Sequence, residues 1–286
     1  MMNRPLDDSR LLPQGVVAAE VRSLRDGVVT SVQDWLAEEV PVALDFNGIT
    51  QAVMLATPAD LDDFALGFAL SEGLLQSRDE LRGIETLRSA EGITLRLEVS
   101  AASEWRLRER RRLLAGRTGC GLCGAESLAQ VQEPRPQPLQ GGVRLSPQAI
   151  SRAQRELRQW QQLQQLTGCT HAAAWCSARD GSVQLVREDI GRHNALDKLL
   201  GALARGRAPE LAPDQGFVCI TSRASYEMVL KSARLGVSAL AAVSAPTAMA
   251  VAMAQQAGQL LVGFVRGDDL VAYTHAERLV LAAPAE

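Results

Sequence analysis

From His171 to Arg266 the sequence alternates short apolar runs with helical segments, and this alternation constrains the fold more than any other feature. Strings such as GFVCITS and VSALAAVS are predicted strands, while SYEMVLKSARLG and PTAMAVAMAQQAG are predicted helices. Strands that alternate with helices favour a mostly parallel or mixed sheet with helices packed on its faces. The apolar share of 47% can fill such a core, but with aromatic residues at 4% the interior must consist of Ala, Leu and Val.

The first half of the chain carries a different pattern. PVALDFNGITQAVMLAT predicts two strands joined at an Asn47-Gly48 turn. TPADLDDFALGFALSEG predicts a helix that begins at Pro58 and ends at Gly73, and two further short strands follow it. We therefore divide the chain into a loosely held N-terminal arm at 1–25, a small α+β domain at 26–115, a mobile cysteine-bearing linker at 116–142 and an α/β domain at 143–286.

The charge and the cysteine content limit which partners and which cellular compartment we expect for this chain. The net charge is −3, so the chain gives no indication of general nucleic-acid binding, although six arginines crowd residues 106–117. Five cysteines are an odd number and the opening MMNRPLDDSR lacks an apolar signal segment, so we expect a reduced, cytoplasmic protein. The longest apolar stretch, 237–254, contains serines and Pro246 and is predicted as a buried strand and helix, not as a membrane span.

Two cysteines, Cys120 and Cys123, lie three residues apart in TGCGLCG. A structural zinc site needs four ligands, and the sequence offers no second close pair of ligands. A thioredoxin-type pair opens a helix, whereas each glycine around these thiols disfavours a helix by about 1 kcal/mol. A thiol on a loop beside arginines has its thiolate form favoured, which suits sulfur relay by thiol exchange. Ordinary surface cysteines remain the alternative that the residues alone leave open.

Polar residues gather in four segments that are predicted to follow strands: REDIGRHN, TSRAS, SAPT and FVRGDD. Ligands of such sheets bind beyond the carboxyl ends of the strands, where helix starts present free N–H groups and positive dipole ends. Ser225 and Thr247 begin predicted helices, and together with Arg223, Lys231 and Arg266 they outline an anion site. Capping of the two helices by the same hydroxyl groups is the alternative.

The first of these segments leads into a third predicted helix. Asn194, with Asp197 three residues later, resembles a capping box. Five further charged or titratable residues precede it, namely Arg187, Glu188, Asp189, Arg192 and His193. This density of charge fits a ligand site and an ion-pair network equally well.

The remaining cysteines and histidines raise one rival function. Cys169, Cys176 and Cys219 lie in or beside apolar strings, and we expect them to pack in the core. The string from His275 to Glu277 matches the H-x-E part of the zinc nucleobase deaminase signature. That signature places H-x-E before P-C-x-x-C, whereas here it follows the cysteines and a glycine stands in place of the proline. We therefore reject a deaminase.

Taken together, TGCGLCG, GCTHAAAW, REDIGRHNALDKLLG, SRASYEMVLKSARLGVSALAAVSAPTAMAVAMA and LLVGFVR resemble the formate dehydrogenase accessory sulfurtransferase family, FdhD. The resemblance extends into the first domain and covers roughly residues 40–280. It implies a homodimeric sulfurtransferase that takes sulfur as a persulfide from a cysteine desulfurase. It further implies delivery of that sulfur to Mo-bis(molybdopterin guanine dinucleotide) before the cofactor enters a molybdenum-dependent formate dehydrogenase. The second domain should then be a three-layer α/β/α domain with a cytidine deaminase-like fold.

The resemblance also assigns roles to residues. Cys120 matches the persulfide-carrying cysteine of the family and Cys123 its partner, with no metal bound by the protein itself. The predicted cofactor-binding residues are Phe264, Val265, Arg266, Gly267, Asp268 and Asp269 by resemblance, and Arg192, His193, Ser222, Arg223, Ser225 and Thr247 at the helix starts. Two departures are Cys169 in place of a glycine and the acidic GDD after GFVR. The rival within this reading is a chaperone that delivers the cofactor without handling sulfur and does not need Cys120.

Overall fold

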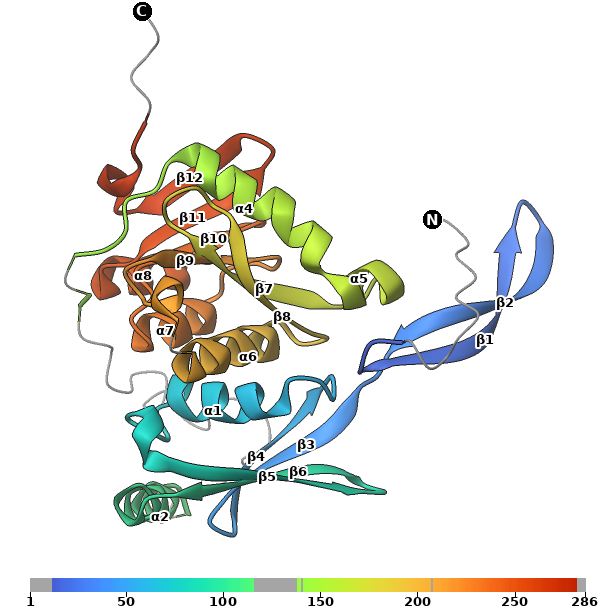
Figure 1. The fold of residues 1–286 in the computed structure, drawn as a ribbon, viewed down its shortest axis with the longest axis horizontal. Helices are drawn as coiled ribbons and strands as arrows, with labels where there is room; N and C mark the ends of the chain where they lie inside the picture. The colour runs from blue at the N-terminus through green and yellow to red at the C-terminus, as the bar shows by residue number, and fades with distance from the viewer. Residues whose placement is uncertain (1–11, 116–137, 140, 207, 282–286) are drawn as a thin grey trace, which may run out of the picture.

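The computed structural model describes residues 12–115, 138–139, 141–206 and 208–281, and shows two packed domains with a projecting arm (Figure 1). The side chains of 110–115 are not among those described. Cys120 and Cys123 lie outside the described residues, as does most of the predicted linker.

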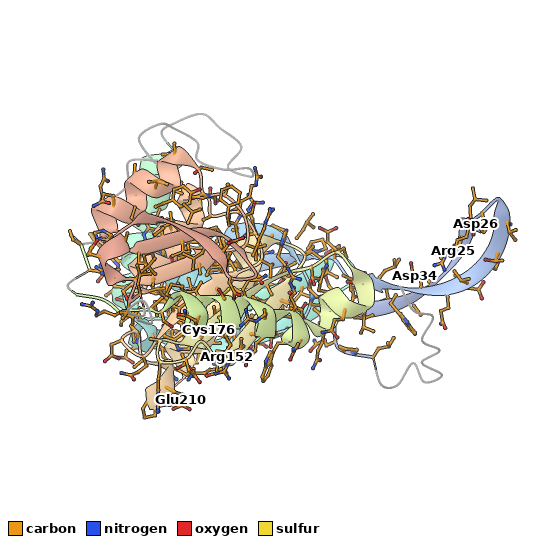
Figure 2. The ribbon with its side chains drawn as sticks, turned by 90° about the horizontal axis from the view of Figure 1, so that it is seen from above. Arg25, Asp26, Asp34, Arg152, Cys176 and Glu210 are labelled. Atoms are coloured by element: carbon orange, nitrogen blue, oxygen red, sulfur yellow. The ribbon has the colours of Figure 1, made fainter. Side chains whose placement is uncertain are left out.

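The arm is a β-hairpin that stands away from the rest of the chain (Figures 1 and 2). Strand β1 (Val16–Arg25) pairs antiparallel with β2 (Val28–Ala37) through a two-residue turn in which Asp26 and Gly27 have φ of 49° and 78°. Positive φ at both positions makes a type I′ turn, which matches the twist of the flanking strands. The sequence predicted irregular chain up to residue 25, so the predicted boundary falls inside this hairpin. The strand was missed because both of its faces are largely exposed, which leaves no clean alternation of apolar and polar residues.

The first domain is built on a four-stranded sheet of order β4-β3-β6-β5. Its elements are β3 (Val40–Phe46), β4 (Ile49–Ala56), α1 (Leu61–Ser71), the short 3₁₀ helix η2 (Arg78–Glu80), β5 (Leu81–Ser89), β6 (Gly92–Val99) and α2 (Ala101–Ala115). The hairpin predicted at Asn47-Gly48 is confirmed, and the Asp45 carboxylate accepts a hydrogen bond from the Gly48 amide at 2.7 Å. Helix α1 begins at Leu61, three residues later than predicted, because Thr57 is held by the second domain instead.

The second domain contains a six-stranded mixed sheet of order β12-β11-β10-β9-β7-β8, in which β9, β10 and β11 are parallel. Its strands are β7 (His171–Ser177), β8 (Val183–Asp189), β9 (Gly216–Ile220), β10 (Ala239–Ala242), β11 (Leu260–Arg266) and β12 (Asp269–Thr274). Its helices are α4 (Pro147–Trp160), α5 (Gln162–Thr167), α6 (Arg192–Arg205), α7 (Tyr226–Arg234) and α8 (Ala248–Ala257), with the short η3 (Pro209–Leu211) and η4 (Ala276–Arg278).

The sheet separates two hydrophobic cores. Trp175 and Leu240 point to the face covered by α6, α7 and α8, whereas their neighbours Cys176 and Ala241 point to the face covered by α4. This alternation is the period-two signature of a strand buried on both faces. The predicted mixed α/β architecture with helices on both sides of the sheet is confirmed. The apolar stretch 237–254 is β10 and α8 as predicted, and within the described residues no helix is long and apolar enough to cross a membrane.

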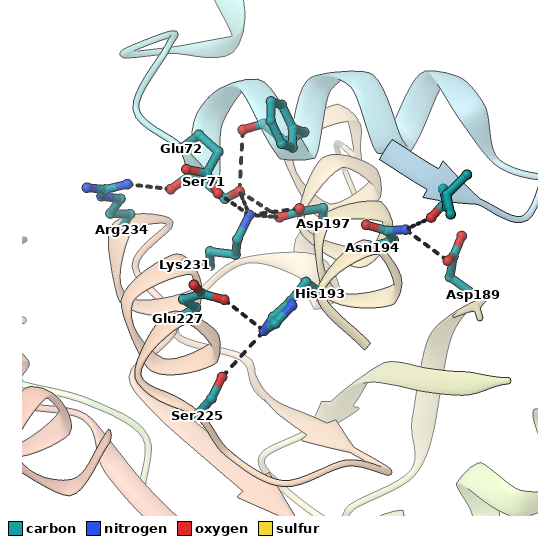
Figure 3. A network of polar contacts seen from close by, with 12 residues as sticks. Ser71, Glu72, Asp189, His193, Asn194, Asp197, Ser225, Glu227, Lys231 and Arg234 are labelled. Atoms are coloured by element: carbon teal, nitrogen blue, oxygen red, sulfur yellow. Dashed lines mark hydrogen bonds and ion pairs between the residues drawn. The ribbon is translucent and has the colours of Figure 1, made fainter. Parts of the chain in front are cut away.

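The two domains meet where α1 crosses α6. Gly67 and Gly201 lie at the crossing, and a Cβ added to either one would collide with backbone atoms of the opposite helix. Buried charges surround this contact: Lys231 Nζ lies 2.8 Å from Asp197 Oδ2 and 3.1 Å from Ser71 Oγ of the first domain (Figure 3). The close crossing and the hydrogen bond of Lys231 to Ser71 join the two domains.

A second group of polar contacts corrects two predictions. Helix α6 begins at Arg192 with Gly191 as its N-cap, so Asn194 does not cap the helix. The Asn194 amide instead donates to the Leu55 carbonyl of the first domain at 2.8 Å (Figure 3). Asp197 is likewise used by Lys231 and not by a capping box. Both side chains were assigned a local role, but each makes a tertiary contact that local spacing does not encode.

Candidate functional site

The loops predicted to form a site do gather at one edge of the second-domain sheet. Strand β7 runs antiparallel to both β8 and β9, so its first residue, His171, lies at the same edge as the carboxyl ends of β8 to β11. The starts of α6, α7 and α8 follow those ends directly. This edge therefore combines helix N-termini with the polar loops, as the strand–helix alternation predicted.

Backbone hydrogen bonds tie these loops to one another. The Thr221 hydroxyl accepts from the Ala172 amide at 2.9 Å, which joins the β9 loop to the start of β7. The Thr247 amide donates to the Ala224 carbonyl at 3.0 Å, and the Phe264 amide donates to Ser244 at 3.3 Å. Each loop is thus held by the next. We call this edge of the sheet, formed by the start of β7 and the loops that follow β8 to β11, the rim; its loops form a continuous surface.

The hydroxyl groups at the helix starts behave differently from each other. Thr247 caps α8, because its Oγ1 accepts from the Ala250 amide at 3.2 Å. Ser225 occupies the N-cap position of α7, but its side chain makes no capping hydrogen bond within the described chain. Its Oγ lies 3.4 Å from His193 Nε2 instead (Figure 3). The N-terminus of α7, where the positive dipole end lies, is therefore not capped by the Ser225 hydroxyl in the described chain.

His193 is held by an acidic partner that the sequence did not single out. Its Nε2 lies 3.0 Å from Glu227 Oε2 in the first turn of α7, and this hydrogen bond lowers the pKa of Glu227 (Figure 3). Burial, reinforced by the nearby Arg192, lowers the pKa of His171. Glu227 was missed because an acidic residue in a first turn already has a local explanation in the helix dipole.

Arg192 brings an unsatisfied donor to the same place. Its Nε is buried and has no hydrogen-bond partner among the described residues. A buried donor on a charged group costs free energy when it is left unpaired, so an acceptor from outside the described chain would be stabilised there. Arg223 adds an exposed guanidinium on the neighbouring loop.

Phe264 is the second unusual feature of the rim. Its φ is 53°, and the pairing of β11 with β12 is irregular between Gly263 and Arg266. A bulky residue in the left-handed region costs on the order of 1–3 kcal/mol and persists only where its surroundings impose it. The strained backbone turns the ring outward, with 38% of its surface exposed and the Arg266 guanidinium 5.8 Å from the ring centre. The result is a flat aromatic face beside a cation.

The rest of the predicted 264–269 segment is less suited to contact a ligand through side chains. Val265 is fully buried in the core beneath α4. Gly267 has φ of 60° in the turn before β12, and Asp268 lies 3.2 Å from Arg155 of α4. Any contact from this part of the segment would therefore come from its backbone.

Several charged residues predicted near the site serve the fold instead. Lys231 lies at the domain interface and is not part of an anion site, which corrects that prediction. Arg187 pairs with Asp63 of the first domain at 2.7 Å. Asp189 pairs with the fully buried Lys198, also at 2.7 Å. For these residues the ion-pair alternative holds, and of the charged string only Arg192 and His193 belong to the rim.

The three cysteines that the structure describes divide into two classes. Cys176 and Cys219 are buried as predicted, and burial raises the pKa of Cys219 to about 12 and that of Cys176 well above its usual range. Cys169 is exposed just before β7, which corrects the prediction that it packs in the core. It lies two residues before β7 begins at His171, outside the buried positions of that strand, and its thiol is 3.5 Å from the Thr167 hydroxyl.

The remaining zinc-signature residues do not join the rim. His275 follows β12, which runs antiparallel to β11, so it lies at the opposite edge of the sheet. Its Nδ1 lies 3.2 Å from Glu277. In the part of the chain that the structure describes, no three His, Cys, Asp or Glu side chains are grouped so as to hold a metal ion.

Comparison with known proteins adds four findings. Residues 37–280 match the FdhD/NarQ family. The sulfur carrier protein FdhD of Variovorax paradoxus (strain S110) is 58% identical over 274 residues, which cover 96% of this chain and 97% of that protein. The sulfur carrier protein FdhD of Cupriavidus necator is 54% identical over 89% of this chain and 87% of that protein. A crystal structure of a putative formate dehydrogenase accessory protein from Desulfotalea psychrophila has the same fold, with a TM-score of 0.69, 24% identity and coverage of 93% of this chain and 99% of that one.

Proposed function

Because this chain belongs to the FdhD/NarQ family, we propose that it is a sulfur carrier and an accessory protein of formate dehydrogenase, the roles named for its relatives. In this role it takes sulfur from a cysteine desulfurase as a persulfide. It then passes the sulfur to Mo-bis(molybdopterin guanine dinucleotide), which is its substrate, before that cofactor enters a molybdenum-dependent formate dehydrogenase. We further propose that two copies of the chain work together as a homodimer.

The rim of helix starts carries the proposal. Phosphate groups are bound well at helix N-termini, where N–H groups and the dipole face the anion. The start of α7 and the unpaired Nε of Arg192 provide such positions side by side. The exposed ring of Phe264, beside Arg266, offers a stacking face for a base. A ligand that combines phosphates with a planar base, such as a guanine dinucleotide, fits this set of groups better than a simple anion does.

The sulfur-handling step is assigned to the cysteine motif. The Cys120 thiolate would attack the outer sulfur of the desulfurase persulfide, the sulfur–sulfur bond of that persulfide would break, and the desulfurase thiolate would leave. The product is a persulfide on Cys120. Because Cys120 and Cys123 lie outside the described residues, this assignment rests on the TGCGLCG motif and not on geometry.

His193 has a supporting role in this scheme. Glu227 fixes the orientation of its ring, and Ser225 lies at the same ring nitrogen. Held in this way at the rim, His193 orients the bound cofactor or supplies a proton to a leaving oxygen.

Mass spectrometry after incubation with a cysteine desulfurase and cysteine tests the sulfur-handling step. We expect a gain of one sulfur atom located at Cys120, lost in Cys120→Ala. Cys169→Ala is the matched control, because Cys169 is the exposed cysteine among the described residues and should not be needed for loading. Loading that persists in Cys120→Ala would contradict the relay.

Complementation separates the sulfurtransferase from the cofactor chaperone. In a cell that lacks its own accessory protein, Cys120→Ala should fail to restore formate dehydrogenase activity if sulfur transfer is the function. Full restoration by this variant would favour the chaperone, which needs the rim but not the thiol.

Binding of GDP, used as a soluble probe, tests the rim. Phe264→Ala should weaken GDP binding by about 1–2 kcal/mol through lost stacking, measured by isothermal titration calorimetry. Asp268→Asn is the control, since that side chain pairs with Arg155. Equal affinity for the wild type and Phe264→Ala would remove Phe264 from the site.

A further inference from the structure

The β1–β2 arm lacks the contacts that normally stabilise a hairpin. Among the residues that the structure describes, no third strand joins its sheet, and Val16 is the only buried residue of either strand. Apolar side chains near its tip are open to solvent: Leu24 is 69% exposed and Val28 and Val29 are each 61% exposed. A two-stranded hairpin is marginal by itself in water, and unpaired strand edges are sites of further pairing. The arm therefore presents an unpaired strand edge and exposed apolar side chains for contact with a partner.

The outer edge of β1 is the free edge. Among the described elements, α5 packs against β2, whereas no element other than β2 packs extensively against β1. In a hairpin closed by a two-residue turn the flanking residues, here Arg25 and Val28, form a hydrogen-bonded pair. Counting back from Arg25, every second residue of β1 forms its backbone hydrogen bonds with β2. The backbone N–H and C=O groups of the residues between them therefore point outward. Those outward-facing residues are Ala18, Glu20, Arg22 and Leu24.

Charge selects the partner and the register. Glu20 and Arg22 are both exposed and have no ion-pair partner among the described residues. An antiparallel pair of two identical β1 strands places Glu20 opposite itself in one register and Arg22 opposite itself in another. In the intermediate register, Val21 of one strand lies opposite Val21 of the other. Glu20 of each strand then lies opposite Arg22 of the other strand, which gives two pairs of opposite charge. Cross-strand pairs of opposite charge stabilise a sheet and like pairs destabilise it.

We propose that β1 pairs antiparallel with β1 of a second copy of this chain about a two-fold axis at Val21, so that the two arms form one four-stranded sheet. The pairing is isologous, as a closed dimer requires. It also places Val21 against Val21 of the second copy and removes an exposed edge from each arm. The proposal gives a surface to the self-association included in the proposed function and is independent of the sulfur chemistry.

Charge reversal tests the register. Glu20→Arg and Arg22→Glu, each alone, put like charges opposite one another twice, and we expect each to raise the dimer Kd by about tenfold in sedimentation velocity experiments. The double variant Glu20→Arg/Arg22→Glu restores both pairs and should return the Kd to near the wild-type value. Asp34→Arg, on β2, is the control and should leave the Kd unchanged. Circular dichroism checks that each variant is folded.

A cysteine at the axis tests the geometry directly. Opposed residues of a pair without hydrogen bonds have Cα atoms about 4.5 Å apart, within the range that a disulfide spans. Val21→Cys should therefore form a disulfide between two copies on mild oxidation, identified by peptide mapping. Val32→Cys should not, because the two Val32 positions lie three strand spacings apart, about 14 Å.

Each failure has its own meaning. A chain that stays monomeric at all concentrations, a Kd insensitive to both single reversals, or an uncrosslinked position 21 in a dimer overturns the arm assignment. A chain that stays monomeric would also overturn the proposed homodimer, whereas none of these outcomes touches the sulfur-carrier role, which is tested separately by sulfur loading of Cys120.

Discussion

A methyl group at Gly201 should be enough to force the two domains apart. A Cβ at this position would lie 2.8 Å from the Gly67 amide nitrogen and closer still to the Asp63 carbonyl, whereas ordinary contacts fall at 3.4–4 Å. Both neighbours are backbone atoms of α1, so no side chain can rotate away. The helices must therefore separate by more than about half an ångström, and overpacking of this kind costs about 1–3 kcal/mol.

The helix propensity of alanine works in the opposite direction. Gly→Ala in an unconstrained helix position stabilises a protein by about 0.5–1 kcal/mol. At Gly201 the steric cost exceeds this gain, and parting the helices also lengthens the contact of Lys231 with Ser71 of α1 at the same interface. We expect Gly201→Ala to lower the free energy of unfolding by about 2 kcal/mol or more.

Urea denaturation followed by circular dichroism measures this change. Gly83→Ala in β5 is the matched control, because a Cβ there meets only the end of the Glu98 side chain at 3.9 Å and should change stability by less than about 0.5 kcal/mol. If Gly201→Ala unfolds at the wild-type urea concentration, the close crossing of α1 and α6 does not set the domain interface.

Two further predictions concern buried groups. Lys231→Met should cost about 3–5 kcal/mol by urea denaturation because it strands Asp197, and adding Asp197→Leu should recover much of that loss. Burial alone would lower the pKa of Lys231, but the Asp197 and Glu72 carboxylates together outweigh it and raise the pKa above the usual 10.5. The stability from these pairs is therefore present below pH 10.5 and lost as pH rises through the folded-state pKa. A wild-type advantage over Lys231→Met that does not shrink above pH 10.5 would contradict this sign. In native protein at pH 8, we expect Cys169 to react with iodoacetamide and Cys176 and Cys219 not to react, because burial raises the pKa of the latter two thiols. Peptide mapping measures the modification of each cysteine. Modification of Cys219 at the rate of Cys169 would contradict the prediction.

The positions of the rim loops followed from sequence because chain direction decides them. Strand–helix alternation forces the carboxyl ends of parallel strands to one edge, so TSRAS, SAPT and FVR could be placed together without coordinates. The apolar strings around Cys176 and Cys219 likewise predicted that both thiols would be buried. These are consequences of backbone geometry and do not depend on which side chains meet.

Side-chain partners across the domain interface could not be predicted in this way. Lys231 was grouped with the rim arginines, yet it lies in the interface with Asp197. Asn194 has the residue type and spacing of a helix cap, yet it binds a carbonyl of the first domain. Each of these polar groups is buried by the approach of a segment more than thirty residues away, and a local pattern contains no information about that approach.

The sequence by itself determined the family, the cysteine motif and the edge of the sheet at which the helix starts collect, because motif spacing and the direction of the strands are properties of the linear chain. Only the tertiary structure decided that Glu227 holds His193, that Phe264 is strained outward, and that β1 and β2 form a free-standing hairpin. These features arise when distant segments bury one another's polar groups or leave an edge uncovered, and the free energy of that burial is set by three-dimensional neighbours and not by sequence neighbours.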